Sequence, residues 1–248
     1  MTTFTKPVSV LLLDLEGTTT PIDFVYKILY PHAREHVKPY LEEHWESTEV
    51  QADVRALLQE NADDLRRGLD PPLIKGTAEQ VSLGEIVAYV QWLMDRDRKT
   101  TPLKSLQGKI WEAGYSKGEL RGQVFEDVAP AFKRWREQLK SICIYSSGSV
   151  LAQRLMFANS EAGDLSSFIG SYFDTNIGPK QDADSYTKIA AKLDRQPSEI
   201  VFVSDRLIEL DAAAVAGCEV LLCKRPGNDP QTAPLSRALV YSFDEVLP

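Results

Sequence analysis

A short apolar run near the amino terminus delivers two carboxylates onto a glycine turn. Residues 8–13 read Val-Ser-Val-Leu-Leu-Leu, and Asp14, Glu16 and Gly17 follow. Val and Leu at this density are typical of a buried strand in a sheet that is covered on both faces. Because alternate strand residues share a face, the pattern predicts that Asp14 and Glu16 point into the same cleft. Open α/β sheets bind ligands beyond the carboxyl ends of their strands, where this pair would lie.

The segments that follow residue 122 alternate between short apolar runs and helical periodicity. Strands are predicted over Ser141–Tyr145, Ser171–Phe173, Ile200–Ser204 and Val220–Cys223, and helices over Val128–Leu139, from Val150 onward, over Ala183–Leu193 and over Leu207–Ala216. Strands separated by helices of this length imply βαβ units and a parallel sheet. We therefore expect an α/β fold with a Rossmann-like parallel sheet as its core.

Residues 21–122 follow a different pattern, in which strand-like runs are nearly absent. Helices are expected over Phe24–Trp45, Val50–Arg67, Ala78–Asp95 and around Leu103–Ala113, with Asp70-Pro71-Pro72 and Gly76 as interruptions. A helical insertion of this size directly after the first strand predicts a lid. We expect residues 1–20 and 123–248 to form the α/β core and residues 21–122 to form an inserted α-helical cap.

Composition excludes several classes of function. The 248 residues include 28 Lys and Arg against 36 Asp and Glu, which gives a formal net charge of −8. The chain therefore has no basic footprint for nucleic acid or for anionic lipid. No apolar run is long enough to cross a membrane, so no membrane association is expected. Three cysteines, Cys143, Cys218 and Cys223, are expected to be reduced core thiols in a cytoplasmic protein.

Polar residues from three further segments are expected at the same edge of the sheet. Ser146 and Ser147 follow a predicted strand and precede a helix, so their hydroxyls and the nearby N–H groups suit an anion. Serine is also a common N-cap, which is the simpler explanation. Lys180 lies in a turn before a helix, where a solvated lysine is equally ordinary. Asp205 ends another predicted strand, as Asp14 does, and Glu209 follows four residues later.

The charges of these residues indicate a metal ion. Asp14, Glu16, Asp205 and Glu209 would converge with little more than Lys180 to oppose them. Two like charges 4 Å apart cost about 4 kcal/mol at an effective dielectric constant near 20. A phosphate group could not join this cluster without a cation, and an all-oxygen site with open positions suits Mg²⁺. The cluster is therefore a candidate site for metal-assisted phosphoryl transfer.

The order of these residues resembles the four motifs of the haloacid dehalogenase-like hydrolase superfamily. The matching residues are Asp14-Leu-Glu16-Gly-Thr, Ser146, Lys180, and Ser204-Asp205 with Glu209. Within that superfamily the chain is most similar to the enolase-phosphatase family of methionine salvage. This closer resemblance rests on residues 12–22, 97–101, 106–111, 145–150 and 173–178. It covers nearly the whole chain, including the expected cap.

The resemblance implies catalytic and metal-binding roles. Asp14 would be the nucleophile that forms an aspartyl-phosphate, and Glu16 would act as general acid and then as general base. One Mg²⁺ per subunit would be held by the carboxylates of Asp14 and Asp205 and by the backbone carbonyl of Glu16. The chain departs from the superfamily's commoner residues at Glu16, at Ser204 and at Glu209. Glu209 would accordingly meet the metal through water.

The resemblance also implies a substrate. Ser146 and Ser147 would bind the phosphoryl oxygens, and Lys180 would neutralise them and orient the nucleophile. The substrate would be 2,3-diketo-5-methylthiopentyl-1-phosphate, which is enolised and then dephosphorylated to the acireductone. A small-molecule phosphate ester is thus the expected partner of a cytoplasmic monomer. The sequence does not identify the enolisation base; Arg98 and Lys99 are candidates for contacting the substrate, or ordinary surface charges.

Other interpretations of the same residues stay open. Another Mg²⁺-dependent sugar-phosphate phosphatase, or a mutase with an aspartyl-phosphate, would carry the same motifs. A haloacid dehalogenase needs no metal and lacks the acid found here at Glu16, and a binding module with a decayed site would not keep every motif residue. His32, Glu35 and His36 fit H-x-x-E-H, the inverted zinc-protease pattern, with both imidazoles one helical turn apart. Neighbouring histidines on a helix are more often solvated or packed.

Overall fold

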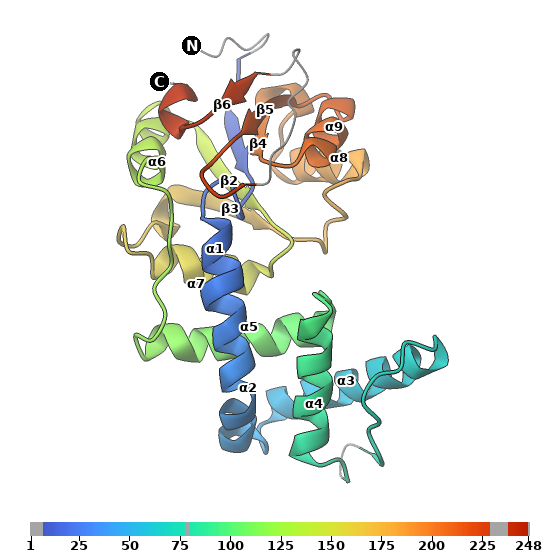
Figure 1. Ribbon diagram of the computed structural model, residues 1–248. Coiled ribbons are helices and arrows are strands. Elements are labelled where there is room, and N and C mark those ends of the chain that lie inside the picture. Colours follow the sequence, from blue (N-terminus) through green and yellow to red (C-terminus); the bar gives the residue numbers. More distant parts are fainter. Residues whose placement is uncertain (1–6, 78–79, 229–237, 248) are drawn as a thin grey trace. The chain divides into compact units, whose positions relative to one another are not determined.

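The chain divides into two compact units. The computed structural model describes residues 7–77, 80–228 and 238–247. One unit is formed by Met1–Val25 together with Arg121–Pro248, and the other by Tyr26–Leu120. The first contains the sheet and its helices, and the second is built from helices (Figure 1).

The strands of the first unit run parallel in a six-stranded sheet of order β3-β2-β1-β4-β5-β6 (Figure 1). They are β1 (Val10–Leu13), β2 (Ser141–Tyr145), β3 (Ile169–Phe173), β4 (Ile200–Ser204), β5 (Glu219–Cys223) and β6 (Leu239–Val240). The order reverses between β1 and β4, and ligands of doubly wound sheets bind at this switch point. The predicted α/β class with a Rossmann-like parallel sheet is confirmed.

The two central strands explain why this edge can hold a site. Every residue of β1 and β4 is buried, as expected for strands covered on both faces. Leu13 at the end of β1 pairs with Ile144 of β2 and with Val203 of β4. This register brings the carboxyl ends of the three strands level, so Asp14 and Ser204 emerge at one edge.

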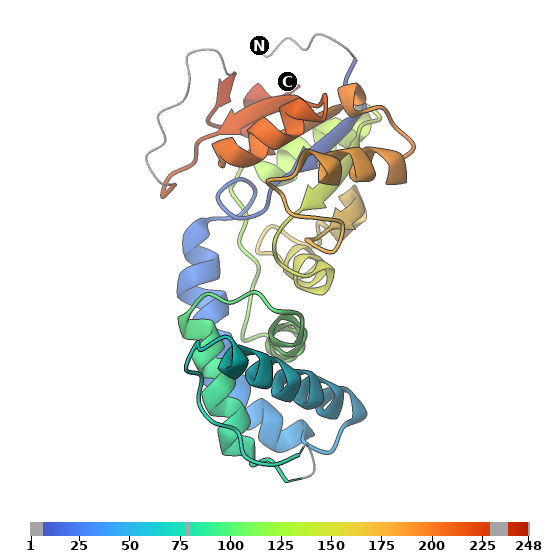
Figure 2. The ribbon, with the colours of Figure 1, turned by 90° about the vertical axis from the view of Figure 1, so that its right-hand side faces the viewer.

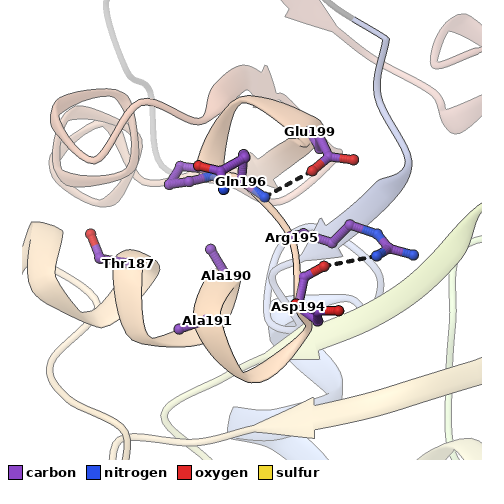
Figure 3. Close-up of a pocket in the computed structure, with 8 residues that line it drawn as sticks. Thr187, Ala190, Ala191, Asp194, Arg195, Gln196 and Glu199 are labelled. Carbon is purple, nitrogen blue, oxygen red and sulfur yellow. Dashed lines mark hydrogen bonds between the residues drawn. The ribbon is translucent and has the colours of Figure 1, made fainter.

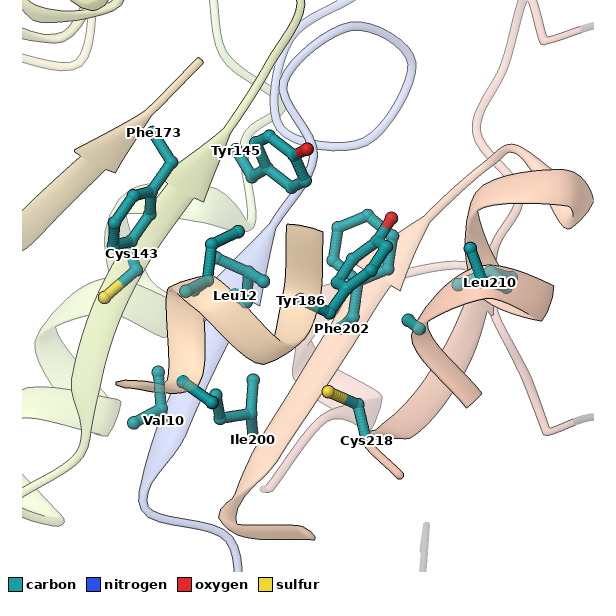
Figure 4. Packing of buried hydrophobic residues seen from close by; sticks show 14 of the residues in the cluster. Val10, Leu12, Cys143, Tyr145, Phe173, Tyr186, Ile200, Phe202, Leu210 and Cys218 are labelled. Atoms are coloured by element: carbon teal, nitrogen blue, oxygen red, sulfur yellow. The ribbon is translucent and has the colours of Figure 1, made fainter. Parts of the chain in front are cut away.

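One face of the sheet is covered by α8 (Ala183–Lys192) and α9 (Leu207–Val215). Figure 4 shows the apolar cluster between them and the strands, in which Tyr186 of α8 lies beside Phe202 of β4. The ring centroids of these two residues are 5.1 Å apart at 60°, an edge-to-face arrangement, and Tyr145 of β2 meets Tyr186 at 5.6 Å. Aromatic packing therefore fixes α8 directly beneath the edge that carries the polar residues.

Two more helices complete the first unit. Helix α6 (Val128–Glu137) packs against β2, and α7 (Val150–Ala158) packs against β3. Phe132 of α6 and Phe157 of α7 contact each other with ring centroids 6.0 Å apart. All three cysteines are buried and form no disulfide, namely Cys143, Cys218 and Cys223.

The second unit is a helical bundle, seen from the side in Figure 2. Its helices are α2 (Tyr30–His44), α3 (Thr48–Arg66), α4 (Leu83–Asp95) and α5 (Thr101–Ser116). Helix α2 packs against α4 and α5, and α3 packs against α5. A short helix α1 (Ile22–Phe24) and a π-helical turn (Val25–Leu29) precede α2. No helix in the described ranges has the length and apolar character to cross a bilayer.

Several element boundaries differ from the predicted ones, each for a local reason. Helix α4 begins at Leu83, because Ser82 forms a capping box with Glu85, and Ala78 lies outside the described residues. Helix α5 begins at Thr101, where Pro102 suits the first turn. The first strand starts at Val10 instead of residue 8.

The prediction that the helix beginning at Val128 extends to Leu139 was wrong. Helix α6 ends at Glu137, and Leu139 has φ +59° and is 91% exposed. The N–H of Lys140 donates to the carbonyl of Trp135 at 2.8 Å, which closes the helix in a left-handed turn. The helical spacing of the apolar residues simply continues past the turn that stops the helix.

Candidate active site

Asp14 directly follows β1, and its carboxylate is held by three donors. Its own N–H donates to the carbonyl of Val203 at 2.9 Å, which extends the pairing with β4. Oδ1 accepts from the N–H of Leu15 at 2.7 Å and from Nζ of Lys180 at 2.6 Å. Oδ2 accepts from Oγ of Ser204 at 2.8 Å. Because Asp14 is only 4% exposed, this buried carboxylate has a fixed orientation.

Lys180 bridges two carboxylates. Its Nζ lies 2.6 Å from Oδ1 of Asp14 and 2.6 Å from Oε2 of Glu209. Burial is the largest effect on the pKa of Lys180 and opposes its charge, but the two carboxylates outweigh it and raise that pKa. The ammonium is therefore charged at neutral pH and offsets part of the acidic cluster.

Three hydroxyls hold the loop that carries Lys180. Tyr186 donates to the carbonyl of Lys180 at 2.7 Å, and Tyr145 donates to the carbonyl of Gly178 at 2.8 Å. Ser185 donates to the carbonyl of Pro179 at 2.8 Å. The rings of the two tyrosines belong to the packed core (Figure 4). The sheet and α8 therefore set the position of the Lys180 side chain.

Acidic side chains from the end of β4 and from α9 complete the cluster. Burial first, and Asp14 next, raise the pKa of Asp205 to about 7 and that of Glu209 to about 7. Oδ1 of Asp205 is buried and has no hydrogen-bond partner among the described residues. Burial and like charge disfavour the ionised forms of these carboxylates, and a hard cation at the unpaired oxygen of Asp205 would relieve that repulsion.

Glu16 lies in a turn beyond β1. Because the strand ends at Leu13, the alternation of strand residues that was expected to orient Glu16 does not reach it. The position of Glu16 is set by the turn. The N–H of Gly17 donates to the carbonyl of Thr20 at 2.8 Å, and Gly17 has φ +74°. A Cβ on Gly17 would stand 2.8 Å from Oδ2 of Asp205. Only glycine lets the backbone at this turn approach Asp205 so closely.

Two residues beyond β5 fasten the same turn. Nδ2 of Asn228 donates to the carbonyl of Gly17 at 2.9 Å, and Nε of Arg225 donates to the carbonyl of Thr18 at 3.0 Å. Nη1 of Arg225 also pairs with Oδ2 of Asp127 at 2.8 Å. Arg225 is only 6% exposed, so the turn is attached to a buried ion pair.

Ser146 and Ser147 lie in the loop between β2 and α7, beside the loop of Asp14. The N–H of Ser146 donates to the carbonyl of Phe173 at 3.1 Å, and its Oγ accepts from the N–H of Gly148 at 3.0 Å. The N-cap of α7 is Ser149, whose Oγ accepts from the N–H of Ala152 at 3.2 Å. The simpler explanation of the first two serines, as N-caps, therefore does not apply.

The structure brings part of the predicted set into direct contact. Lys180 contacts Asp14, and Asp205 meets the turn of Glu16 and Gly17. Ser146 and Ser147 are placed at the same sheet edge by strand pairing. Reasoning from the sequence missed the roles of Ser204, Tyr186, Arg225 and Asn228. The only signal for any of them was Ser204, where the superfamily usually has glycine.

Arg98 and Lys99 belong to the second unit, and Arg98 forms an internal ion pair there. Its Nη2 lies 3.3 Å from Oε1 of Glu60 and 3.1 Å from Oδ1 of Asp64. Asp64 is fully buried and also accepts from the hydroxyl of Tyr89 at 2.8 Å. Nζ of Lys99 lies 3.8 Å from Asp97 near the surface. Both basic residues line a cavity of about 410 Å³.

A separate cavity of about 470 Å³ lies at the opposite edge of the sheet (Figure 3). It is bordered by the end of α8 and by the segment that enters β4, which is the amino edge of a parallel sheet. Its polar groups serve local structure, since Arg195 donates to the carbonyl of Asp194 and the N–H of Gln196 donates to Glu199. The chemistry described above is therefore at the carboxyl edge and not in this cavity.

Known proteins are similar to this chain in sequence and in fold. The model of the haloacid dehalogenase-like hydrolase family matches residues 8–217. "Enolase-phosphatase E1" of Synechococcus elongatus is 50% identical over 243 residues, which are 97% of this chain and 99% of that protein. The protein of the same name from Danio rerio is 46% identical over 226 residues, covering 88% and 86%. The chain belongs to the enolase-phosphatase E1 family of haloacid dehalogenase-like hydrolases.

The likeness extends to a solved structure. The crystal structure of UTR4 protein from Saccharomyces cerevisiae matches with a TM-score of 0.78 at 32% identity. The match covers 96% of this chain and 100% of that chain. This structural match spans the helical insertion as well as the sheet, as does the match to the enolase-phosphatase E1 of Synechococcus elongatus. As a member of that family, the chain is a hydrolase of the phosphatase type.

Proposed function

We propose that this chain is an enolase-phosphatase whose phosphatase step forms an aspartyl-phosphate on Asp14. The observation that carries the proposal is the fixation of the Asp14 carboxylate by Leu15, Lys180 and Ser204. A carboxylate is a poor nucleophile in water, but a desolvated and aligned one can attack a phosphorus atom in line. Membership of the enolase-phosphatase E1 family supports the same activity.

The protein residues divide the phosphatase step between them. An oxygen of Asp14 forms a bond to phosphorus while the bond from phosphorus to the substrate oxygen breaks. Glu16 gives a proton to that leaving oxygen, and then takes one from the water that attacks the aspartyl-phosphate. Attack at phosphorus releases inorganic phosphate and returns the Asp14 carboxylate. Lys180 opposes the negative charge throughout, because its pKa keeps it protonated.

Mg²⁺ is the proposed cofactor, one ion per subunit. The carboxylates of Asp14 and Asp205 and the backbone carbonyl of Glu16 would hold it. The unpaired Oδ1 of Asp205 and the close approach of the Gly17 turn to that carboxylate support this assignment. When bound, the ion would neutralise the acidic cluster and polarise oxygens of the substrate.

Ser146 and Ser147 are the proposed binding groups for the phosphoryl oxygens. Oγ of Ser146 already accepts one hydrogen bond, so its own proton is available to a phosphoryl oxygen. Ser147 lies in the same loop and is partly exposed. Backbone N–H groups that precede α7 would add to this seat for an anion.

The proposed substrate is 2,3-diketo-5-methylthiopentyl-1-phosphate, which is enolised before it is dephosphorylated to the acireductone. We propose that residues 21–122 act as a cap that excludes water from this reaction. Another sugar-phosphate phosphatase or mutase with the same nucleophile remains the alternative. It would release or move phosphate without an enol intermediate.

One experiment tests the activity and its nucleophile together. The purified protein is mixed with the diketo phosphate and Mg²⁺, while enediol absorbance and inorganic phosphate are followed. We expect an enol signal that precedes phosphate release. Asp14→Asn should lower phosphate release to about a thousandth or less, whereas Asp184→Asn on the exposed start of α8 should not change it. Phosphate without an enol signal would favour the alternative, and an active Asp14→Asn variant would refute the proposal.

We also propose that the enzyme works as a monomer in the cytoplasm. The buried, unpaired thiols of Cys143, Cys218 and Cys223 support a reducing compartment. Size-exclusion chromatography with light scattering tests the oligomeric state, and a mass of twice 27.8 kDa would contradict it. Fractionation of the source cells tests the compartment.

A further inference from the structure

A second polar cluster lies within the helical unit. His32 and His36 are four residues apart on α2 and their rings stack, with centroids 4.0 Å apart at 15°. Nε2 of His32 lies 3.4 Å from Oε2 of Glu119, and Nε2 of His36 lies 3.9 Å from the same oxygen. One possible ligand atom from each of the three lies within 4.8 Å of the others. Among the described residues, this is the group of His, Cys, Asp or Glu side chains close enough together to hold one metal ion.

The end of α5 explains how Glu119 reaches the histidines. The N–H of Gly118 donates to the carbonyl of Tyr115 at 3.0 Å, and the N–H of Glu119 donates to the carbonyl of Gly114 at 2.9 Å. These bonds form a Schellman turn, and Gly118 has the left-handed φ of +74° that such a turn requires. The turn brings Glu119 back against α2. Its position is therefore set by backbone geometry.

The imidazoles are oriented toward Glu119 by their surroundings. Nδ1 of His36 lies 2.9 Å from the backbone carbonyl of His32, which can only accept, so Nδ1 is the donor and Nε2 is the ring nitrogen nearer Glu119. The ring of His32 lies tightly against α5, because a Cβ on Gly114 would stand 2.6 Å from its Cε1.

We propose that His32, His36 and Glu119 form a Zn²⁺ site. Two imidazole nitrogens and one carboxylate oxygen are a ligand set that zinc takes, with water in the fourth position. Zinc–nitrogen bonds of about 2.0–2.1 Å in a tetrahedron place the ligand atoms about 3.3 Å apart. Two of the three separations are 3.4 Å and 3.9 Å, so the stacked imidazoles and the carboxylate must shift to close around an ion.

This site differs in chemistry from the acidic edge of the sheet. The proposed Mg²⁺ ligands there are all oxygen atoms, and the side-chain ligands among them are Asp14 and Asp205. Imidazole nitrogen favours zinc and its neighbours in the transition series over Mg²⁺ or Ca²⁺. A bound zinc ion would connect α2 to the turn after α5, and because it binds only the folded unit it would stabilise that unit.

The site also accounts for part of the H-x-x-E-H pattern without a protease. Both histidines of the pattern converge, but the third ligand is Glu119, which lies 83 positions beyond His36 in the chain. Glu35, the acid of the pattern, is exposed on α2. The zinc ion would therefore serve the structure of the helical unit.

Zinc titration of the full chain tests the proposal. Excess Mg²⁺ is present to occupy the all-oxygen site at Asp14 and Asp205 (the oxygen site), so that zinc does not bind there. Competition with a chromophoric chelator measures affinity, and Co²⁺ in place of Zn²⁺ reports a tetrahedral N/O site by its visible absorbance. We expect one equivalent of zinc and a rise in melting temperature. His36→Gln and Glu119→Gln should weaken binding at least about tenfold and abolish the rise, whereas Glu35→Gln should leave both unchanged.

The remaining outcomes would overturn the proposal. They are the absence of stoichiometric zinc binding, equal affinity in wild type and in both ligand variants, or equal losses in Glu35→Gln and Glu119→Gln. Zinc that is lost in Asp205→Asn but kept in His36→Gln would belong to the oxygen site, and this too would refute it. Circular dichroism checks that each variant is folded. Because Glu35 and Glu119 are exposed, we expect Glu35→Gln and Glu119→Gln to fold normally.

Discussion

Nζ of Lys180 lies 2.6 Å from Oδ1 of Asp14, although the two residues are 166 positions apart in the chain. Their side chains are 9% and 6% exposed, so neither charge is well solvated. The attraction between them therefore offsets two large desolvation penalties. Removal of one partner leaves a buried charge without compensation, which typically costs about 3–5 kcal/mol.

This pair predicts the effect of Lys180→Met. We expect loss of phosphatase activity and a decrease of about 3 kcal/mol in the free energy of unfolding, measured by urea denaturation. The double variant Lys180→Met with Asp14→Asn should recover part of that stability, because no charged partner of the pair remains. Equal stability of wild type and Lys180→Met would contradict the argument. Lys188→Met, an exposed lysine on α8, is the matched control.

Ser204 should matter for rate more than for substrate binding. Its Oγ donates to Oδ2 of Asp14 at 2.8 Å and lies 3.0 Å from Oε2 of Glu209. A serine hydroxyl has a single proton to donate, and alanine has none. The alanine variant therefore leaves Asp14 with one donor fewer. We expect Ser204→Ala to lower kcat about tenfold, equivalent to about 1.4 kcal/mol, with little change in KM. Steady-state phosphate release measures both, and a change confined to KM would be inconsistent with this role.

Tyr186 offers a test of the loop that carries Lys180. Its buried hydroxyl donates to the Lys180 carbonyl at 2.7 Å. Tyr186→Phe keeps the packed ring but leaves that carbonyl unpaired, so stability should fall by about 1–2 kcal/mol and kcat should fall with it. Tyr172→Phe is the matched control, because the hydroxyl of Tyr172 is buried and has no partner in the part of the chain that the structure describes. Similar losses in the two variants would mean that the hydrogen bond has no special role.

How much of this could be predicted from the sequence depends on the range of each interaction. The strands around Asp14 and Asp205 were predictable, because a buried parallel strand has a local apolar signature. Ser204 contacts Asp14 across 190 positions, and Arg225 contacts Thr18 across 207. Even where a motif includes the residue, as with Ser204, no local pattern shows which distant residue it contacts. Only the completed sheet order brings them together.

The same reasoning explains the errors at element ends. Leu139 continues the helical spacing of apolar residues, yet it is 91% exposed because the chain has already turned. Backbone hydrogen bonds close a left-handed turn there. A glycine at this position would have indicated such a turn in the sequence, but a leucine does not. Arg98 is another case: the sequence could not show that the buried Asp64 was its partner.

Arg98 and Lys99 should behave differently when they are replaced. Arg98 compensates the fully buried Asp64, so Arg98→Met should lower the free energy of unfolding by about 2–3 kcal/mol. Lys99 pairs at 3.8 Å with the exposed Asp97, so Lys99→Ala should not change stability measurably. If Lys99 contacts the substrate, its variant should slow enolisation. Normal kinetics in both steps would remove Lys99 from the site, and a stable Arg98→Met variant would contradict the ion-pair argument.

Gly17 and Gly68 allow backbone strain to be separated from a role at the metal. Both have left-handed backbones, with φ of +74° and +71°, so alanine should cost each position about 1–2 kcal/mol of stability. Nothing lies within 4 Å of a Cβ on Gly68, whereas a Cβ on Gly17 would stand 2.8 Å from Oδ2 of Asp205.

Gly17→Ala should therefore raise the Mg²⁺ concentration needed for half-maximal phosphate release, and Gly68→Ala should not. The carboxylate of Asp205 must move away from the new methyl group, and Mg²⁺ tolerates little departure from octahedral geometry. Titration of Mg²⁺ against phosphate release, with urea denaturation of each variant, measures the two effects separately. An unchanged Mg²⁺ requirement in a folded Gly17→Ala variant would show that Asp205 does not hold the ion beside this turn.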